Sequence, residues 1–310
     1  MTAAVPLPPG VTVLERGWLS SNNVFFEGRD SFALVDSGYC THSQQTVALV
    51  RRLLRGRALD LLLNTHLHSD HCGGNAALQS AFPAMQTRIP PGLAAHVREW
   101  DPVALTYVPT GQQCPRFRID NLLMPGTEVL LADRPWQIHA APGHDPHSVI
   151  LFEPQSRTLI SADALWENGF GVVFPELEGE HAFDEVAATL DLIERLDPAV
   201  VIPGHGRVFT DEQGVAAALA RARSRLASFV QDPARHARHA AKVLLKFKLL
   251  ELQRLPYREF EAWALATPFL HEVVARYYGE QDASALVRAL ALELEKSGAA
   301  AMSGDDIMNA

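Results

Sequence analysis

The chain has 310 residues, of which 47% are hydrophobic and 20% charged, and its formal net charge is −9. This length allows one large domain or one domain with an appendage, and the acidic balance excludes a general electrostatic attraction for nucleic acid. No apolar run reaches the roughly eighteen residues of a membrane span, and residues 1–10 lack the features of a secretory signal. The three widely spaced cysteines, Cys40, Cys72 and Cys114, indicate reduced thiols and a cytoplasmic location.

The N-terminal region is predicted to form a strand meander followed by a strand–helix–strand unit. Short apolar runs at 11–15, 23–27 and 32–35 are bounded by turn residues and predict three strands. Residues 43–54 have helical spacing, and 61–64 predict a buried strand. Alternation of strand, helix and strand is typical of a βαβ-like unit in an α/β fold.

The segment 65–71 follows this strand and places four potential metal ligands within six residues. Neutral imidazole is the commonest metal ligand in proteins. His66 and His68 point the same way if the chain leaves the strand extended, because side chains repeat every second residue. Asp70 and His71 then turn away and can face a second ion. The motif therefore offers ligands to two adjacent metal ions.

Residues 65–74 match, at every specified position, the T-H-x-H-x-D-H-x-G-G signature of the metallo-β-lactamase superfamily, which the sequence resembles over about residues 12–210. The resemblance implies a four-layer αβ/βα sandwich with one or two metal ions at one edge of two mixed sheets. It also implies three later ligands. Candidates stand in the right order in Pro142-Gly143-His144, Ser161-Ala162-Asp163 and Pro203-Gly204-His205.

The resemblance also implies how the ligands divide between two divalent ions. One ion is expected on His66, His68 and His144, the other on Asp70, His71 and His205, and Asp163 is expected to bridge them together with a hydroxide. Two close cations lower the pKa of a shared water, which then attacks a carbonyl carbon or a phosphorus. Asp70 is expected to take the proton and pass it to the leaving group. Nitrogen and carboxylate ligands suit zinc first, with iron or manganese as alternatives.

Four positions depart from the family pattern or support the site from outside. His147 stands where many relatives carry glycine, and Asp145 replaces a hydroxyl residue. His147 is a candidate catalytic proton donor or oxyanion contact, with a structural hydrogen bond as the alternative. The methyl group of Ala162, where the family often has glycine, is expected to narrow the site. Asp36 is expected to support the metal loop, or else to be a simple turn residue.

After Thr210 the strands are expected to stop. Helices are predicted at 212–230, 234–252, 257–264, 268–278 and 283–296, and the last residues from Ser297 are expected to be frayed. The sequence therefore predicts a catalytic domain at 1–210 and a helical C-terminal domain at 211–310. The latter resembles the helical or winged-helix appendage of type II glyoxalases and of nuclease-like relatives.

The leading interpretation is a metal-dependent hydrolase of a thioester or ester, similar to hydroxyacylglutathione hydrolase. A phosphodiesterase or nuclease is an alternative, because eight basic residues and one acid lie between Arg221 and Lys248. A mono-iron sulfur dioxygenase and a metal-retaining binding or signalling protein are further alternatives. We expect a small-molecule substrate and no membrane partner. Nucleic acid is a less favoured partner, and the sequence leaves a homodimer open.

Overall fold

The computed structural model describes residues 7–210, 214–279 and 282–310. The prediction that residues 1–10 lack a secretory signal concerns in part residues 1–6, which lie outside the described residues. The helix predicted at 212–230 begins at Glu212, which also lies outside them. Within the described residues, no helix combines the length and the hydropathy that crossing a bilayer requires.

Two compact units make up the chain, residues 1–105 with 113–227 and residues 106–112 with 228–310. The boundary expected after Thr210 is therefore displaced to residue 227. The reason is that the change from strands to helices marks a change of element type and not of packing. The helix that follows Thr210 buries Ala218 and Ala222 as part of the first unit.

The first unit contains two six-stranded sheets. In the first sheet the strands run in chain order, with β1–β3 antiparallel and β3–β6 parallel. Its strands are β1 (Val11–Leu14), β2 (Asn23–Glu27), β3 (Phe32–Val35), β4 (Leu61–Leu63), β5 (Gln86–Ile89) and β6 (Asn121–Leu122). The meander and the strand–helix–strand unit predicted for the N-terminal region are both present.

The second sheet has the order β12-β11-β10-β9-β8-β7, and only β10 and β11 are parallel neighbours. Its strands are β7 (Glu128–Leu131), β8 (Arg134–Ala140), β9 (Val149–Glu153), β10 (Thr158–Ala162), β11 (Val200–Pro203) and β12 (Phe209–Thr210). Strands β8, β10 and β11 therefore run in the same direction, so their carboxyl ends lie at the same edge.

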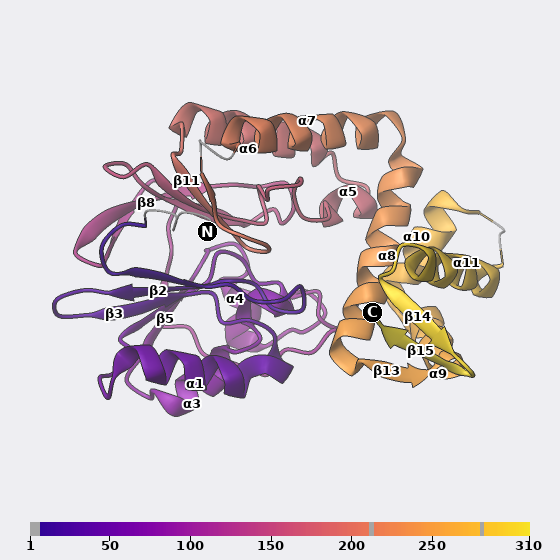
Figure 1. Cartoon of the computed structure of the whole chain (residues 1–310), viewed down its shortest axis with the longest axis horizontal. Coiled ribbons are helices and arrows are strands. Elements are labelled where there is room, and N and C mark those ends of the chain that lie inside the picture. The colour runs from indigo at the N-terminus through magenta and orange to yellow at the C-terminus, as the bar shows by residue number, and fades with distance from the viewer. Residues whose placement is uncertain (1–6, 211–213, 280–281) are drawn as a thin grey trace. The chain divides into compact units, whose positions relative to one another are not determined.

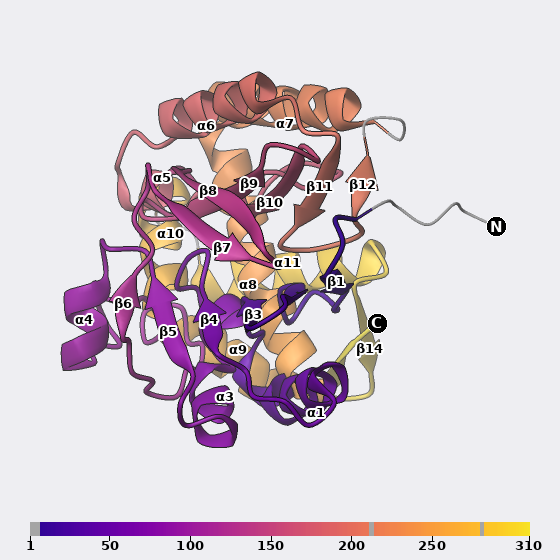
Figure 2. The ribbon, with the colours of Figure 1, turned by 90° about the vertical axis from the view of Figure 1, so that its left-hand side faces the viewer.

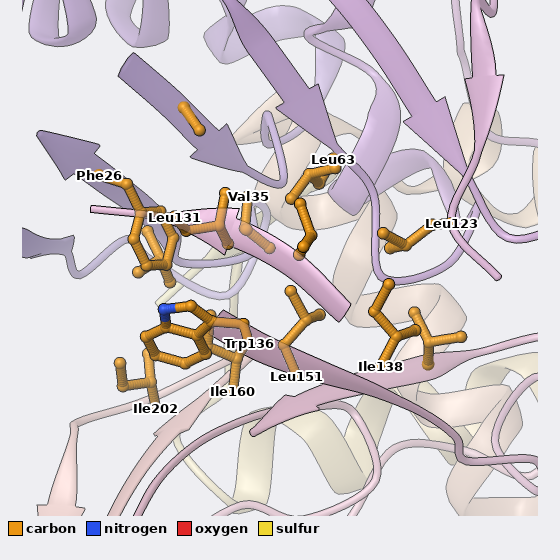
Figure 3. Packing of buried hydrophobic residues seen from close by; sticks show 14 of the residues in the cluster. Phe26, Val35, Leu63, Leu123, Leu131, Trp136, Ile138, Leu151, Ile160 and Ile202 are labelled. Carbon is orange, nitrogen blue, oxygen red and sulfur yellow. The ribbon is translucent and has the colours of Figure 1, made fainter. Parts of the chain in front are cut away.

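The main core lies between the two sheets. Side chains from both sheets interdigitate there, with the indole of Trp136 fully buried (Figure 3). Phe26, Val35 and Leu63 come from the first sheet, and Leu151 and others from the second. This packing follows from the strand period of two, which sends alternate apolar residues to the inner face.

Helices cover the outer faces of both sheets, which completes four layers (Figure 2). On the first sheet α1 (Ser43–Leu54) and α3 (Asn75–Ala81) bury Val47, Val50, Leu54 and Leu78 in a second core. The second sheet is covered by α6 (Phe183–Leu196) and α7 (Val215–Gln231). Shorter elements lie in the connections: η1 (Cys40–His42), α2 (Ser69–Cys72), α4 (Ala94–Glu99) and α5 (Phe174–Glu178). The αβ/βα sandwich expected from the sequence is confirmed.

The C-terminal unit is not purely helical (Figure 1). Its helices are α8 (Pro233–Leu252), α9 (Tyr257–Ala266), α10 (Pro268–Tyr277) and α11 (Ala283–Lys296). A three-stranded sheet of order β13-β15-β14 accompanies them, formed by β13 (Arg254–Pro256), β14 (Ala300–Ser303) and β15 (Asp306–Asn309). The expectation that strands stop after Thr210 and that the terminus frays is therefore wrong. The strands are stabilised by pairing with residues about fifty positions away, which local composition does not reveal.

Candidate metal centre

The predicted ligands meet at one edge of the first unit because each follows the carboxyl end of a strand. The segment 65–71 follows β4, and His144, Asp163 and His205 follow β8, β10 and β11. The two sheets are tied together at this edge by a hydrogen bond from Val149 N to Thr65 O, 2.9 Å. The ligand-capable side chains form two groups, within each of which the ligand atoms lie within 4.8 Å of one another.

The first of these, the tri-histidine group, consists of His66, His68 and His144. His68 Nδ1 lies 3.1 Å from His66 Nε2 and 2.8 Å from His144 Nε2. His144 Nδ1 donates to the carbonyl oxygen of Val172, 2.5 Å, so its Nε2 carries a lone pair. Thr65 Oγ1 donates to Asp36 Oδ2 and accepts from His66 Nδ1, 3.2 Å. The proton of His66 is then on Nδ1, so its Nε2 also carries a lone pair. Both lone pairs face His68 Nδ1, so either a proton on that nitrogen or a cation between the three rings offsets their repulsion.

The carboxylate group consists of Asp70, His71, Asp163 and His205. Asp70 Oδ2 lies 3.0 Å from His205 Nε2, and Asp163 Oδ1 lies 3.4 Å from His71 Nε2. His71 is fully buried, and its Nε2 has no hydrogen-bond partner. A buried, unpaired ring nitrogen between two carboxylates is the environment that a bound cation would satisfy.

Asp163 faces both groups. While Oδ1 is directed at His71, Oδ2 lies 3.4 Å from His144 Nε2 and 3.9 Å from His205 Nε2. The carboxylate can approach this closely because residue 204 is glycine. A Cβ atom at Gly204 would lie 2.2 Å from Asp163 Oδ1. One side chain thus offers an oxygen to each group.

Asp36 supports the motif from outside, as one of the two readings of the sequence predicted. Its Oδ1 accepts from Thr65 N, 2.9 Å, and its Oδ2 accepts from Thr65 Oγ1 and His71 Nδ1, both 2.8 Å. A carboxylate on the outer nitrogen of an imidazole fixes its tautomer and leaves Nε2 available to a metal ion.

The two groups differ in their protonation equilibria. Burial lowers the pKa of His144 to about 4, and burial together with the neighbouring imidazoles lowers that of His66 well below its usual value. Burial opposes protonation of His71 as well, but Asp163, Asp36 and Asp70 outweigh it and raise the pKa of His71 well above the usual range. Burial would raise the pKa of Asp163, yet His71 and His205 hold it well below its ordinary value.

Two of the departures from the family pattern, Asp145 and His147, lie beside the tri-histidine group. Asp145 is buried, and its Oδ2 lies 3.8 Å from Nε2 of His68, the ring nitrogen that faces away from the group. Its Oδ1 accepts a hydrogen bond from the backbone N–H of His147, 2.7 Å. The His147 ring is exposed and lies against Gly92, where an added Cβ would be 2.2 Å from it. His147 belongs to neither ligand group, and its catalytic role stays a prediction.

Ala162 adopts a left-handed backbone conformation, φ +46°, at an irregularity in the pairing of β10 with β11. Glycine adopts this conformation without steric cost, whereas alanine does not. Backbone geometry therefore accounts for the glycine that the family resemblance implies at position 162. The narrowing of the site by the methyl group of Ala162 stays a prediction.

The β1–β2 loop was predicted only as a turn, yet it organises the site. Asn22 Nδ2 donates to the carbonyl oxygens of Pro203 and Gly206, and Ser21 N donates to the carbonyl oxygen of Asp70, 3.0 Å. In the same loop Trp18 stacks on His205. Sequence patterns do not show these contacts, because they join residues that are far apart in the chain, from about 50 to almost 190 positions.

The donor set fits divalent metal ions. Imidazole nitrogens and carboxylate oxygens suit zinc, iron and manganese. A cation would satisfy both the unpaired nitrogen of His71 and the lone pairs that converge in the tri-histidine group. In chemical terms, such a centre can activate water and polarise a carbonyl or phosphoryl oxygen.

Comparisons with known proteins agree with this geometry. Residues 16–205 match the model of the Metallo-beta-lactamase superfamily. A hydroxyacylglutathione hydrolase of Synechococcus sp. (strain JA-3-3Ab) is 29% identical over 147 residues, 46% of this chain and 48% of that protein. An acyl-coenzyme A thioesterase of Bos taurus is 26% identical over 227 residues, 65% of this chain and 79% of that protein.

Among solved structures, a metallo-beta-lactamase family protein from Thermus thermophilus superposes with a TM-score of 0.55 at 19% identity. The match covers 98% of this chain and 100% of the other, and it shows likeness of fold alone. The chain spans about half the length of the hydroxyacylglutathione hydrolase that it matches.

Proposed function

The chain belongs to the metallo-beta-lactamase superfamily, and we propose that, as a metal-dependent hydrolase of that family, it cleaves a thioester or ester bond of a small-molecule substrate. The observation that carries the proposal is the position of Asp163, which offers one oxygen to each ligand group. The relatives named as a hydroxyacylglutathione hydrolase and an acyl-coenzyme A thioesterase support the thioester class.

In this proposal two divalent ions, zinc first, bind on the two groups. The tri-histidine group would hold one ion, and Asp70, His71 and His205 the other, with Asp163 shared between them. When bound, such ions lower the pKa of water and polarise the carbonyl that is attacked. Asp70, whose side chain is 14% exposed, is placed to accept a proton and return it to the leaving group. His147 remains a candidate for contact with the substrate.

The nuclease alternative depends on the basic run, and the contacts of that run give it little support. Arg223 pairs with Asp191 and Glu194, and both Arg238 and Lys242 pair with Glu293. These cations are already engaged with carboxylates of the chain, which lowers their attraction for phosphates. Arg235 is exposed and is the member best placed to test the alternative.

The proposal is tested with the metal-loaded protein and two substrates. We expect turnover of thioesters such as S-lactoylglutathione and no turnover of bis-p-nitrophenyl phosphate. The reverse pattern would support the phosphodiesterase, and oxygen-dependent oxidation of a persulfide with one iron per chain would support the dioxygenase. Retained metal with no turnover of any of these would favour the binding protein.

A further inference from the structure

The side chain of Trp18 is unusually exposed for its position beside the candidate metal centre. It leaves 56% of its surface open to solvent, whereas His205, on which it stacks, is only 4% exposed. The ring centroids lie 5.4 Å apart and the ring planes differ by 10°. Trp18 therefore covers one face of a candidate ligand ring. The other face of the indole is open beside the candidate metal centre, where an apolar part of a substrate could pack against it.

A second indole forms a corner with the first. The ring of Trp166 lies edge-on to Trp18, with centroids 5.4 Å apart and planes at 67°. It is also edge-on to His205, at 5.4 Å and 77°. Trp166 Nε1 donates to Asp163 Oδ1, 3.2 Å, so this ring is fixed with respect to the carboxylate that faces both ligand groups.

The turn that carries Trp166 is held rigidly from α7. Trp166 N donates to the carbonyl oxygen of Gly169, 2.7 Å. Arg221 Nε donates to the carbonyl oxygen of Glu167, 2.8 Å, and an Arg225 N–H donates to that of Asn168, 3.2 Å. A ring that is fixed before the ligand arrives loses little conformational freedom on binding. Two arginines of the basic run therefore serve to position this corner.

We propose that Trp18 and Trp166 form a subsite for a flat, apolar acyl group, so that the protein prefers aromatic acyl thioesters to small ones. The inference rests on the proposed hydrolase function and names its substrate class. The subsite adjoins His205 and Asp163, so an aryl group on the carbon next to the scissile carbonyl can contact the indoles. Aromatic rings that pack edge-to-face or offset-stacked attract one another beyond the burial of their area, which favours an aryl group over a methyl group here.

The test uses two thioesters that differ only at this group. N-acetylcysteamine thioesters of mandelate and lactate share the hydroxyl and the leaving thiol, but one carries a phenyl ring and the other a methyl group. We expect a higher kcat/KM for the mandeloyl compound. Trp18→Ala should lower the ratio of the two kcat/KM values about tenfold, and Trp18→Phe should lower it less.

The matched control is Leu130→Ala, which shortens another exposed apolar side chain of the first unit, on β7, and should leave the ratio unchanged. An unchanged ratio in Trp18→Ala would overturn the subsite. A second pair of thioesters shares one acyl group and differs in the thiol. If Trp18→Ala loses discrimination only within this pair, the subsite is also overturned, because the indoles would then contact the leaving group.

A binding measurement separates failure of the subsite from failure of the hydrolase function. Calorimetric titration should give tighter binding of mandelate than of lactate, and Trp18→Ala should remove the difference. If the unaltered protein hydrolyses neither thioester, the hydrolase proposal fails, and the titration alone decides the subsite. Equal affinities for mandelate and lactate in the unaltered protein would overturn it.

Discussion

The tri-histidine group and the carboxylate group lie at the same edge of one unit, yet they respond to protons in opposite ways. In the tri-histidine group, burial lowers the pKa of His144 to about 4 and keeps the ring neutral. In the carboxylate group, three aspartates raise the pKa of His71, so a proton can occupy the place of a cation. Loss of metal should therefore leave a proton in place of the cation in the carboxylate group and three neutral rings in the tri-histidine group.

The largest effect should come from breaking the tri-histidine group. We expect His68→Ala to abolish hydrolysis and to remove metal, because His68 Nδ1 lies between the other two ligand nitrogens. The loss of activity should be larger than the loss of about 10–100-fold that follows when a hydrogen-bond partner of a metal ligand is removed. Activity assays and metal analysis measure both effects. His181→Ala, a change at an exposed histidine outside both groups, is the control. Full activity and metal content in His68→Ala would refute the assignment.

The second prediction sharpens the difference in protonation. In metal-depleted protein the free energy of unfolding should fall as the pH drops from about 6.5 towards 4. An unfolded histidine binds a proton near pH 6.5, but folded His144 does so only near pH 4. The contribution of His144 to the free energy of unfolding is therefore fully present above pH 6.5. It falls by about 3 kcal/mol as the pH drops to about 4. The raised pKa of His71 acts in the opposite direction only near and above pH 6.5, because an unfolded histidine is itself protonated at lower pH.

Denaturant titrations of metal-depleted protein between pH 4 and 7 test this prediction. His144→Gln should reduce the slope, because glutamine does not titrate, while His66, whose pKa is also lowered, should keep part of it. His181→Gln, at an exposed histidine outside both groups, is the matched control. An equally steep dependence in His144→Gln would show that other groups carry the effect.

The contrast between the two groups also shows what the sequence could and could not predict. The meeting of the candidate ligands was predictable because the motif at 65–71 is local and because each later candidate follows a strand that apolar runs reveal. The difference in protonation between the two groups was not predictable, because it depends on three carboxylates around the ring of His71: Asp36, Asp163 and Asp70. The sequence also predicted Asp36 as a support, although a turn residue was an equal alternative.

What the sequence missed has a common physical cause. Asn22 donates a hydrogen bond to the carbonyl oxygen of Pro203, and Trp18 stacks on His205. Each contact spans about 180 positions, and no local period encodes it. Likewise, the hairpin of β14 and β15 is built from small and polar residues that resemble a frayed end. Its stability comes from pairing with Arg254–Pro256 and from the fully buried Ile307. Apolar periodicity predicts which face of an element is buried but not which distant segment covers it.

A smaller effect should follow from Asp145→Asn. The carboxylate lies 3.8 Å from the outer nitrogen of His68, where a negative charge favours a ligand imidazole that carries its proton on Nε2. Asparagine keeps an oxygen for the backbone N–H of His147 but loses the charge. We expect metal at the tri-histidine group to bind about tenfold more weakly, measured by competition with a chelator. Asp133→Asn, at an exposed carboxylate, should change nothing, and equal affinity in both variants would remove Asp145 from the site.

The smallest effect concerns the backbone that delivers Asp163. Ala162 is buried and has φ +46°, a conformation that costs alanine more than glycine. Ala162→Gly should therefore stabilise the metal-depleted protein by about 1 kcal/mol, which corresponds to a rise of about 2–4 °C in Tm. Ala141→Gly provides the opposite case. Ala141 is equally buried but has an ordinary backbone conformation, so glycine there should lower Tm. If both variants lose stability alike, the left-handed backbone at Ala162 carries no strain, and the preference of relatives for glycine must come from the space that the site requires.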